Sequence, residues 1–234
     1  MKYNSCLVLI GLLWAVSCQS QVSSARQEKA QADILQHLNT QLKSGAWTTS
    51  QVLTNPEWMK LHSLTAFREL IKVHAKSEPL TITVPDEPGL KTTIKAKATD
   101  RNGAPMADVL VYFYQTDTKG WYADTAAHVR MNEGDMRHAR LFGYVKTDRE
   151  GKFEFHTIRP NGYPNSELPA HIHLHFWRSD GTVVHGMPDE LLFEEDERLT
   201  PERKKAALSS GFIISKNTGT IEQTVYEYQL TPRY

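Results

Sequence analysis

Hydrophobic residues recur at helical spacing in the first third of the chain. From about Gln27 to Leu42 the aliphatic residues fall on one helix face, and Ser44-Gly45 supplies a stop. A second helix is predicted from Asn55-Pro56, a cap residue followed by proline at the first helical position, to about Ala75. The inward positions are Ile34, Leu35, Leu38 and Leu42 in the first helix, and Trp58, Leu61, Leu64, Phe67, Leu70 and Ile71 in the second. We expect this helical segment, residues 30–78, to cover a sheet face or to form a homo-oligomer contact.

After Pro79 the pattern changes to short runs of alternating hydrophobic and polar residues. The runs are Leu80–Val84, Thr92–Ala98, Val109–Gln115, Leu141–Lys146, Lys152–Ile158, His171–Trp177, Thr182–His185 and Thr224–Leu230. Short strands separated by Asn-Gly and Asp-Gly turns are typical of an antiparallel sandwich or barrel. A short helix is expected from Thr200-Pro201 to Gly211. The predicted fold is mainly β: an antiparallel β-sandwich over residues 79–234, preceded by a two-helix segment.

The composition is that of an ordinary folded protein. Of 234 residues, 40% are hydrophobic and 23% are charged, and the 27 basic side chains balance the 27 acidic ones. These values exclude disorder, collagen and a multi-span membrane protein. Because the formal net charge is zero, no net field attracts nucleic acid, and we expect a small-molecule or protein ligand instead.

The N-terminus has the pattern of an export signal. Lys2 is followed by an uncharged apolar run from Cys6 to Val16, which is too short to span a bilayer. Ala15-Val16-Ser17-Cys18 resembles a bacterial lipobox, and a plain signal peptide is the alternative. We therefore expect a signal over residues 1–17, cleavage before a lipidated Cys18, and a flexible tether over residues 18–29. The protein would then be exported and anchored in a bacterial cell envelope, facing the periplasm or the outside, with that lipid as its only membrane contact and no thiol left for disulfides.

The candidate chemistry begins in the strand from His171 to Trp177. Because side chains alternate along a strand, His171, His173 and His175 share one face while Ile172 and Leu174 point into the core. Two imidazoles on alternate positions of one strand can chelate a metal, and a polar, solvent-facing strand side is the alternative. In the helical segment the histidines have no partner at ligand spacing and are expected to be solvated or core residues: His37, His62 and His74.

Other donors must complete such a metal site. A cupin-like carboxylate is absent after the His pair, Glu167 is poorly placed across Pro169, and His175 could serve only if the strand bulged. Tyrosine is the remaining donor. Tyr122 follows the strand Val109–Gln115, and Tyr163 lies in a turn-rich segment eight residues before His171. Each tyrosine alone could be a packing residue, but two loop tyrosines with a His-x-His pair form a specific combination.

On these residues the chain resembles the intradiol ring-cleavage dioxygenases, which open catechols and protocatechuate. Gln115 to Tyr122 is similar to the Gln-x-Asp-x-x-Gly-x-Tyr segment of that family, and Pro169 to His173 is similar to its histidine segment. The resemblance also includes Asp100 to Val109 and Thr147 to Pro164, and it runs to about Asp196. The Asp-x-x-Gly-x-Pro and Thr-Asp-x-x-Gly turns occur in non-catalytic sandwich modules such as transthyretin-like domains as well, so they indicate the fold alone.

The resemblance implies a mononuclear Fe(III) held by Tyr122, Tyr163, His171 and His173. It also implies a catechol-type substrate and O2, with Tyr163 leaving the metal when the diol binds and no organic cofactor. Hard phenolates favour a trivalent cation, which would stabilise their ionised form. Alignment of residues 189–196 with a later strand of the family puts Glu190, as a further candidate catalytic residue, where the family commonly has Gln. Trp121 and His128 are candidates to line the pocket.

One departure from the family pattern concerns charge. Leu168 stands where the family usually has Arg, a cation that can stabilise charge developing on the substrate ring. Arg159, Arg140 or Arg130 could take its place in space. Three hypotheses follow: an Fe(III) intradiol dioxygenase, a non-catalytic β-sandwich module that binds a metal or a ferric catecholate, and a structural sandwich without a metal.

Overall fold

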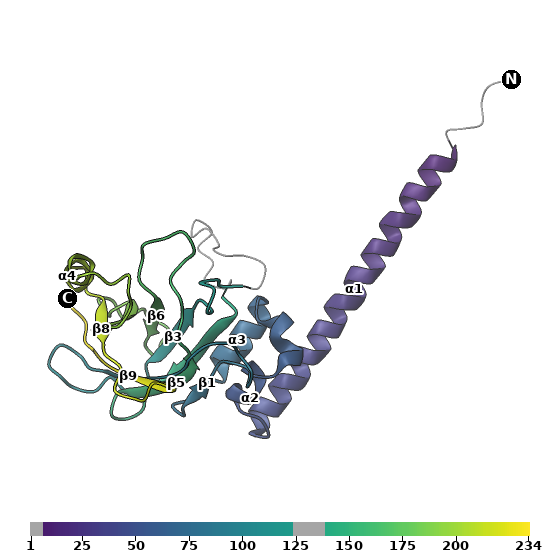
Figure 1. Ribbon diagram of the computed structural model, residues 1–234. Coiled ribbons are helices and arrows are strands. Elements are labelled where there is room, and N and C mark those ends of the chain that lie inside the picture. The colour runs from purple at the N-terminus through teal and green to yellow at the C-terminus, as the bar shows by residue number, and fades with distance from the viewer. Residues whose placement is uncertain (1–6, 124–138) are drawn as a thin grey trace. The chain divides into compact units, whose positions relative to one another are not determined.

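The computed structural model describes residues 7–123 and 139–234, and it divides into two units, Met1–Ala46 and Trp47–Tyr234 (Figure 1). The first unit consists of the helix α1 (Leu7–Ser44), which ends at the predicted stop, where Gly45 has a φ of 74°. The stretch expected to be a flexible tether lies within α1. Its Ala, Arg, Gln, Glu and Lys residues are good helix formers, which explains the difference. Among the described residues no helix combines the length and hydrophobicity that a membrane span requires.

The second unit begins with three short helices: the first was not predicted, and the other two replace the one continuous helix that was predicted from Asn55-Pro56 to about Ala75. They are α2 (Thr49–Leu53), the 3-10 helix η1 (Pro56–Leu61) and α3 (Thr65–Val73). Asn55 caps η1 and proline occupies its first position, as expected. The helix breaks at His62, however, where the buried imidazole binds the carbonyl of Arg140 through Nδ1 at 2.9 Å. This tertiary contact explains why the helical periodicity does not produce a single helix.

Within residues 7–123 and 139–234, nine strands form two sheets (Figure 1). One has the order β1-β5-β2-β9, with β1 (Leu80–Thr81), β5 (Lys152–Ile158), β2 (Lys91–Ala98) and β9 (Gln223–Leu230). The other has the order β4-β3-β6-β7-β8, with β4 (Leu141–Lys146), β3 (Leu110–Gln115), β6 (His171–Trp177), β7 (Glu190–Phe193) and β8 (Ile213–Ser215). The expectation of antiparallel sheets is only partly correct, because β1 with β5, β2 with β9, and β7 with β8 pair in parallel. Parallel pairs arise here because the chain leaves one sheet and re-enters it beside a distant strand.

The predicted strands and the observed ones agree closely around the core. The bounds of β4, β5 and β6 are those expected from the alternation. The segment 182–185 makes only an isolated bridge between Val183 and Trp177, and β8 was not predicted because three residues are too few to show a period. The helix α4 (Pro201–Ser210) begins and ends as expected, with Thr200 as N-cap and Gly211 in the left-handed conformation.

Aromatic side chains join the two sheets. The rings of Phe113 on β3 and Phe155 on β5 stack with centroids 3.7 Å apart, and the Tyr228 hydroxyl on β9 donates to the carbonyl of Leu192 on β7 at 3.0 Å. Both phenylalanines are fully buried. The interior of the sandwich is therefore packed, and Gln115 on β3 is satisfied there by hydrogen bonds to Thr157 and Ile158 on β5.

We predict that Phe155→Ala lowers the free energy of unfolding by about 3 to 5 kcal/mol, because it removes a stacked ring and leaves a cavity between the sheets. Urea denaturation measures this loss. Ile221→Ala is the control, since Ile221 is 89% exposed and its truncation is expected to change the unfolding free energy by less than about 0.5 kcal/mol. Equal losses in the two variants would contradict the packing described here.

Stability should also fall in mild acid because of His62. Burial lowers the pKa of His62 from 6.5 to about 4. The unfolded chain therefore binds a proton between these values that the folded chain does not, and stability is lost as the pH falls from about 6.5 toward 4. Full loss would amount to about 3 kcal/mol.

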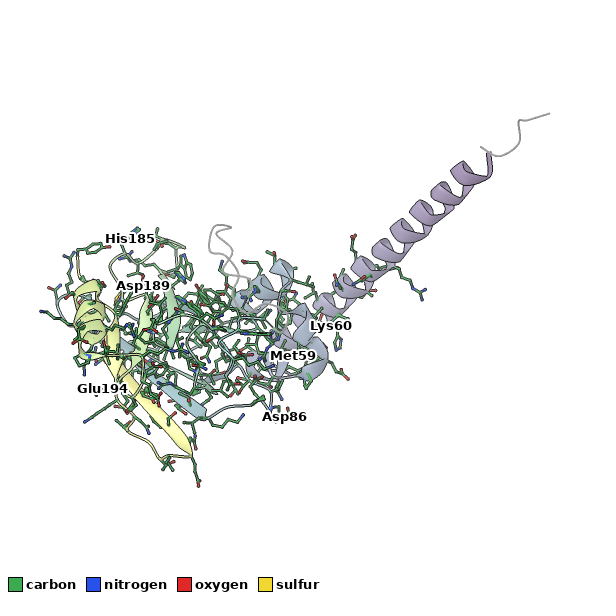
Figure 2. The ribbon with its side chains drawn as sticks, turned by 45° about the horizontal axis from the view of Figure 1, so that its top comes forward. Met59, Lys60, Asp86, His185, Asp189 and Glu194 are labelled. Carbon is green, nitrogen blue, oxygen red and sulfur yellow. The ribbon has the colours of Figure 1, made fainter. Side chains whose placement is uncertain are left out.

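Urea denaturation at pH 7 and at pH 4.5 measures this effect. In the variant His62→Gln the drop between the two pH values should shrink by about 2 kcal/mol. The exposed His185 (Figure 2) gives the matched control His185→Gln, in which the drop should stay as in the wild type. An unchanged drop in His62→Gln would contradict the assignment of the acid sensitivity to this residue.

Candidate metal centre

The strand β6 presents two histidines on the face away from the sandwich interior. Ile172 and Leu174 are buried between the sheets, whereas His171 and His173 lie on the other face and are only 8% and 9% exposed. His175 shares this face, but its ring stacks on Tyr114 with centroids 6.1 Å apart. The predicted alternation is therefore correct, and the structure does not bring the third histidine to the other two.

The loop after β3 places Tyr122 beside these histidines. The Asp117 carboxylate accepts hydrogen bonds from the backbone of Lys119 at 2.8 Å and of Trp121 at 3.0 Å, which closes a tight turn. At the other side of the loop, the Arg140 amide donates to the Tyr122 carbonyl at 2.6 Å. Tyr122 is held from both sides as a result, and it is only 2% exposed.

The loop after β5 brings Tyr163 to the same place through contact between the two backbones. The Asn161 amide donates to the Asp117 carbonyl at 3.1 Å, and the Thr116 hydroxyl donates to the Asn161 carbonyl at 2.6 Å. Gly120, at a φ of 76°, lies so close that an added Cβ would come within 2.2 Å of the Gly162 carbonyl oxygen. The approach of the tyrosines therefore depends on a glycine in the first loop.

Four donor atoms converge at this point. The hydroxyl of Tyr122 lies 2.5 Å from that of Tyr163 and 2.9 Å from His173 Nε2. The Tyr163 hydroxyl lies 3.0 Å from His171 Nε2 and 3.3 Å from His173 Nε2, and the two Nε2 atoms are 3.1 Å apart. The structure thus brings together all four residues predicted as metal ligands.

The second nitrogen of His171 fixes which form of the ring faces this cluster. His171 Nδ1 lies 2.8 Å from the Pro169 carbonyl, which can only accept, so Nδ1 carries the proton and Nε2 presents a lone pair to the cluster. The neighbouring Ala170 amide donates to Asp196 at 3.1 Å, which anchors the start of β6. This is the arrangement that metal-binding histidines commonly have.

Both phenols resist ionisation in the absence of a cation. Burial is the main cause that raises the pKa of Tyr122 and of Tyr163 above 10. A trivalent cation would reverse this tendency by stabilising the phenolates.

Glu190 lies next to the cluster but on another side of it. In the ladder between β6 and β7 it pairs with His173, and its carboxylate is 3.7 Å from His173 Nδ1, too far for a hydrogen bond. Ligand atoms of His171, His173 and Glu190 all lie within 4.8 Å of one another, so these three residues form a second possible donor set. Burial raises the pKa of Glu190.

A cavity of about 540 Å³ opens beside the donor atoms. Tyr163, His171, His173 and Glu190 form one end of it, and residues of α4 form another part of the wall, whereas Tyr122 does not line it. A second cavity of about 630 Å³ lies over β2, β5 and β9. None of the four donor residues lines it, so we do not assign it to the site.

The residues proposed to replace the missing arginine are engaged elsewhere. Arg140 makes a bidentate pair with Glu87 at 2.7 and 2.8 Å, and Arg159 packs on the Phe193 ring at 3.7 Å and faces Asp196. Leu168 does line the cavity and is 55% exposed. Arg130 and His128 lie outside the described residues, and Trp121 is not among the described residues that line this cavity.

Two arginines with a place in or near the site were not predicted from the sequence. Arg203 lines the cavity from α4. Arg68 on α3 is buried, donates to the Tyr112 hydroxyl at 3.0 Å and contacts the carbonyl of Ala139, next to the residue that holds the Tyr122 backbone. Neither has a sequence signal, because each reaches the site from a helix far away in the chain.

Comparison with known proteins assigns the family. A family model described as Dioxygenase matches residues 66–229, which is most of the chain. The chain belongs to the Dioxygenase family. The family assignment agrees with the predicted resemblance, and the matched region includes all four converging residues.

Curated relatives of this dioxygenase-family chain are similar over parts of their length. It is 32% identical over 106 residues to "Catechol 1,2-dioxygenase 1" of Acinetobacter lwoffii, covering 38% of this chain and 32% of that protein. It is 27% identical over 143 residues to "Protocatechuate 3,4-dioxygenase beta chain" of Burkholderia cepacia, covering 54% and 57%. The chain thus spans between about one third and just over half of these relatives.

A solved structure supports the fold. The dioxygenase domain of a dioxygenase and carbohydrate-binding protein fusion from Streptomyces sp. SirexAA-E superimposes with a TM-score of 0.50 at 20% identity, covering 67% of this chain and 88% of that one. At 20% identity this similarity shows a shared fold and no more.

We predict that Gly120→Ala separates the two tyrosines, because the new methyl group would collide with the Gly162 carbonyl. The matched control is Gly103→Ala: Gly103 has a similar φ of 83° but open space around it, so both variants suffer the same backbone strain of about 1 kcal/mol. Urea denaturation should show a loss in Gly120→Ala that exceeds the loss in Gly103→Ala by about 1 to 3 kcal/mol. Equal losses would contradict the close contact between the loops.

Proposed function

We propose that this chain is an Fe(III)-dependent intradiol dioxygenase that cleaves a catechol-type aromatic diol with O2. The observation that carries the proposal is the convergence of two tyrosine hydroxyls and two histidine nitrogens beside a cavity. The family assignment and the relatives that act on catechol and protocatechuate support the same chemistry.

The donor set fits a ferric ion. Two ligands with metal bonds of about 2.0 Å are about 2.8 Å apart at a right angle and about 3.3 Å apart in a tetrahedral arrangement. Most of the observed separations, from 2.9 to 3.3 Å, fall in this range, and the pair of hydroxyls at 2.5 Å is slightly closer. Two phenolates are hard, anionic ligands, so Tyr122, Tyr163, His171 and His173 would favour Fe(III) over Fe(II).

The two histidines and Glu190 form the competing site. Such a set is typical of Fe(II) oxygenases. Both Nε2 atoms, however, face the tyrosine hydroxyls, whereas Glu190 approaches the opposite nitrogen of His173. In our proposal Glu190 borders the substrate in the cavity without binding the metal.

The two proposed tyrosine ligands differ in how firmly they are held. Tyr122 is buried and bonded on both flanks of its loop, so it stays in place. Tyr163 lines the cavity, so it is the tyrosine that an entering diol reaches. We propose that Tyr163 gives way to the substrate and that its Oη accepts one of the diol protons.

The reaction needs no reductant beyond the substrate. When bound, the ferric ion would chelate the diol and draw electron density from the ring, which activates it toward O2. The carbon–carbon bond between the two hydroxyl-bearing carbons breaks, and each of these carbons receives one atom of O2 to become a carboxylic acid. The diol supplies all the electrons, so the proposed reaction calls for no organic cofactor.

A binding module is the second candidate function, and Leu168 favours it. An exposed leucine lines the cavity where the family usually has an arginine, so one source of charge stabilisation is missing. Such a protein would hold a metal or a ferric catecholate without turnover.

We also propose that the domain is exported and held at a bacterial cell envelope by a lipid on Cys18, after cleavage of residues 1–17. The apolar run and the lipobox-like residues support this localisation. A homo-oligomer through the helical segment remains part of the hypothesis.

The metal ligands can be tested with Tyr122→Phe and His171→Ala. Each variant removes one of four donors, so we expect tight iron binding to be lost, together with the tyrosinate-to-iron absorption band in the visible range. Iron content and the visible spectrum of the purified variants measure this. The control is Tyr144→Phe, which removes a hydroxyl from the same face of the sheet, where the ring stacks on Tyr112.

Three results would be decisive for the function. Iron, the visible band and a ring-opened acid after addition of catechol in air would support the dioxygenase. A spectral shift without product would support the binding module. Unchanged iron content in both Tyr122→Phe and His171→Ala would remove these residues from the site.

A further inference from the structure

The cavity beside the donor atoms has an uneven distribution of charge. At one end lie Tyr163, the two histidines and Glu190. Much of the remaining wall consists of apolar side chains, among them Leu192 and Phe212. Arg203 on α4 is the one Lys or Arg among the described residues that line this cavity. A planar apolar ring would suit the apolar wall, and a negative group would suit only the part of the wall that holds Arg203.

The present partners of Arg203 hold it weakly. Its guanidinium pairs with Glu167 at 2.5 Å and donates to the Arg198 carbonyl at 3.0 Å. Glu167 is 85% exposed, and an ion pair so open to water contributes little to stability. Replacing the ion pair with Glu167 by an ion pair with a ligand carboxylate would therefore cost little free energy. The hydrogen bond to the Arg198 carbonyl would keep the guanidinium at the cavity.

We propose that Arg203 is a specificity-determining residue that selects aromatic vicinal diols carrying a carboxylate. This inference rests on the proposed function, because the donor cluster would bind the diol end of the same molecule. A guanidinium matches the planar, two-oxygen geometry of a carboxylate. Glu190 lies beside the donor atoms and disfavours the reverse orientation, since that orientation would bring two carboxylates together. The ligand is thus oriented by charge at one end and by the diol at the other.

The test compares two ligands that differ in one substituent: 3,4-dihydroxybenzoate and 4-methylcatechol. Calorimetry with the full, metal-free chain measures the Kd of each, and kcat/KM of the iron-loaded chain measures their turnover. We expect the acid to bind about tenfold more tightly than the methyl compound, because a hydrogen-bonded charge pair is gained. In Arg203→Gln this preference should fall to about twofold or less. Arg203→Lys keeps the positive charge but loses the planar pair of donors, so it should retain part of the preference for the acid.

Lys204→Gln is the matched control. Lys204 is the next residue on α4 and pairs with Glu194, which Figure 2 labels. Lys204 is not among the described residues that line the cavity. It should leave the preference unchanged. Glu167→Gln frees Arg203 and should tighten binding of the acid by about twofold.

The outcomes separate this inference from the proposed function. Equal affinity for the two ligands, no binding of either, or an unchanged preference in Arg203→Gln would overturn the role of Arg203. Turnover of 4-methylcatechol with no preference for the acid would leave the dioxygenase intact and remove the inference alone. A preference for the acid that depends on Arg203 in the metal-free chain, with no turnover of either ligand after iron loading, would support the inference and contradict the enzyme.

Discussion

The contact between two loop backbones is the constraint on which the site depends. The loop after β3 and the loop after β5 come from different sheets, yet they touch at Gly120 and Gly162 and share hydrogen bonds through Asp117 and Asn161. This contact brings the hydroxyls of the buried Tyr122 and the half-buried Tyr163 within 2.5 Å of each other. Burial disfavours the ionised form of such phenols, and a highly charged cation provides a physical reason for the fold to hold them together.

Some residues of the site are held in place by hydrogen bonds, whereas others border a cavity. Tyr122 and the start of β6 are fixed by hydrogen bonds, from the Arg140 amide to the Tyr122 carbonyl and from the Ala170 amide to Asp196. Tyr163 and Arg203 instead border a cavity of about 540 Å³. A site of this kind keeps some ligands in place while a ligand on the open side can exchange, which ring cleavage at a chelated diol requires.

Local patterns in the sequence predicted most of the strands and the shared face of the histidines, but not the long-range parts of the site. The alternation in His171–Trp177 correctly placed His171 and His173 on one face, because side-chain direction in a strand is a local property. The parallel pairing of β2 with β9 and the break at His62 depend on partners distant in the chain. The same is true of Arg203, which reaches the cavity from α4, whereas the nearer Arg140 and Arg159 are bound by Glu87 and by Phe193 with Asp196.

The most direct test of the account is a crystal structure of the iron-loaded protein with anomalous diffraction measured at the iron edge. The account predicts one iron peak within bonding distance of Tyr122 Oη, Tyr163 Oη, His171 Nε2 and His173 Nε2, with Glu190 outside the coordination sphere. A peak held by the two histidines and Glu190 without the tyrosines, or no iron peak at this position, would contradict it.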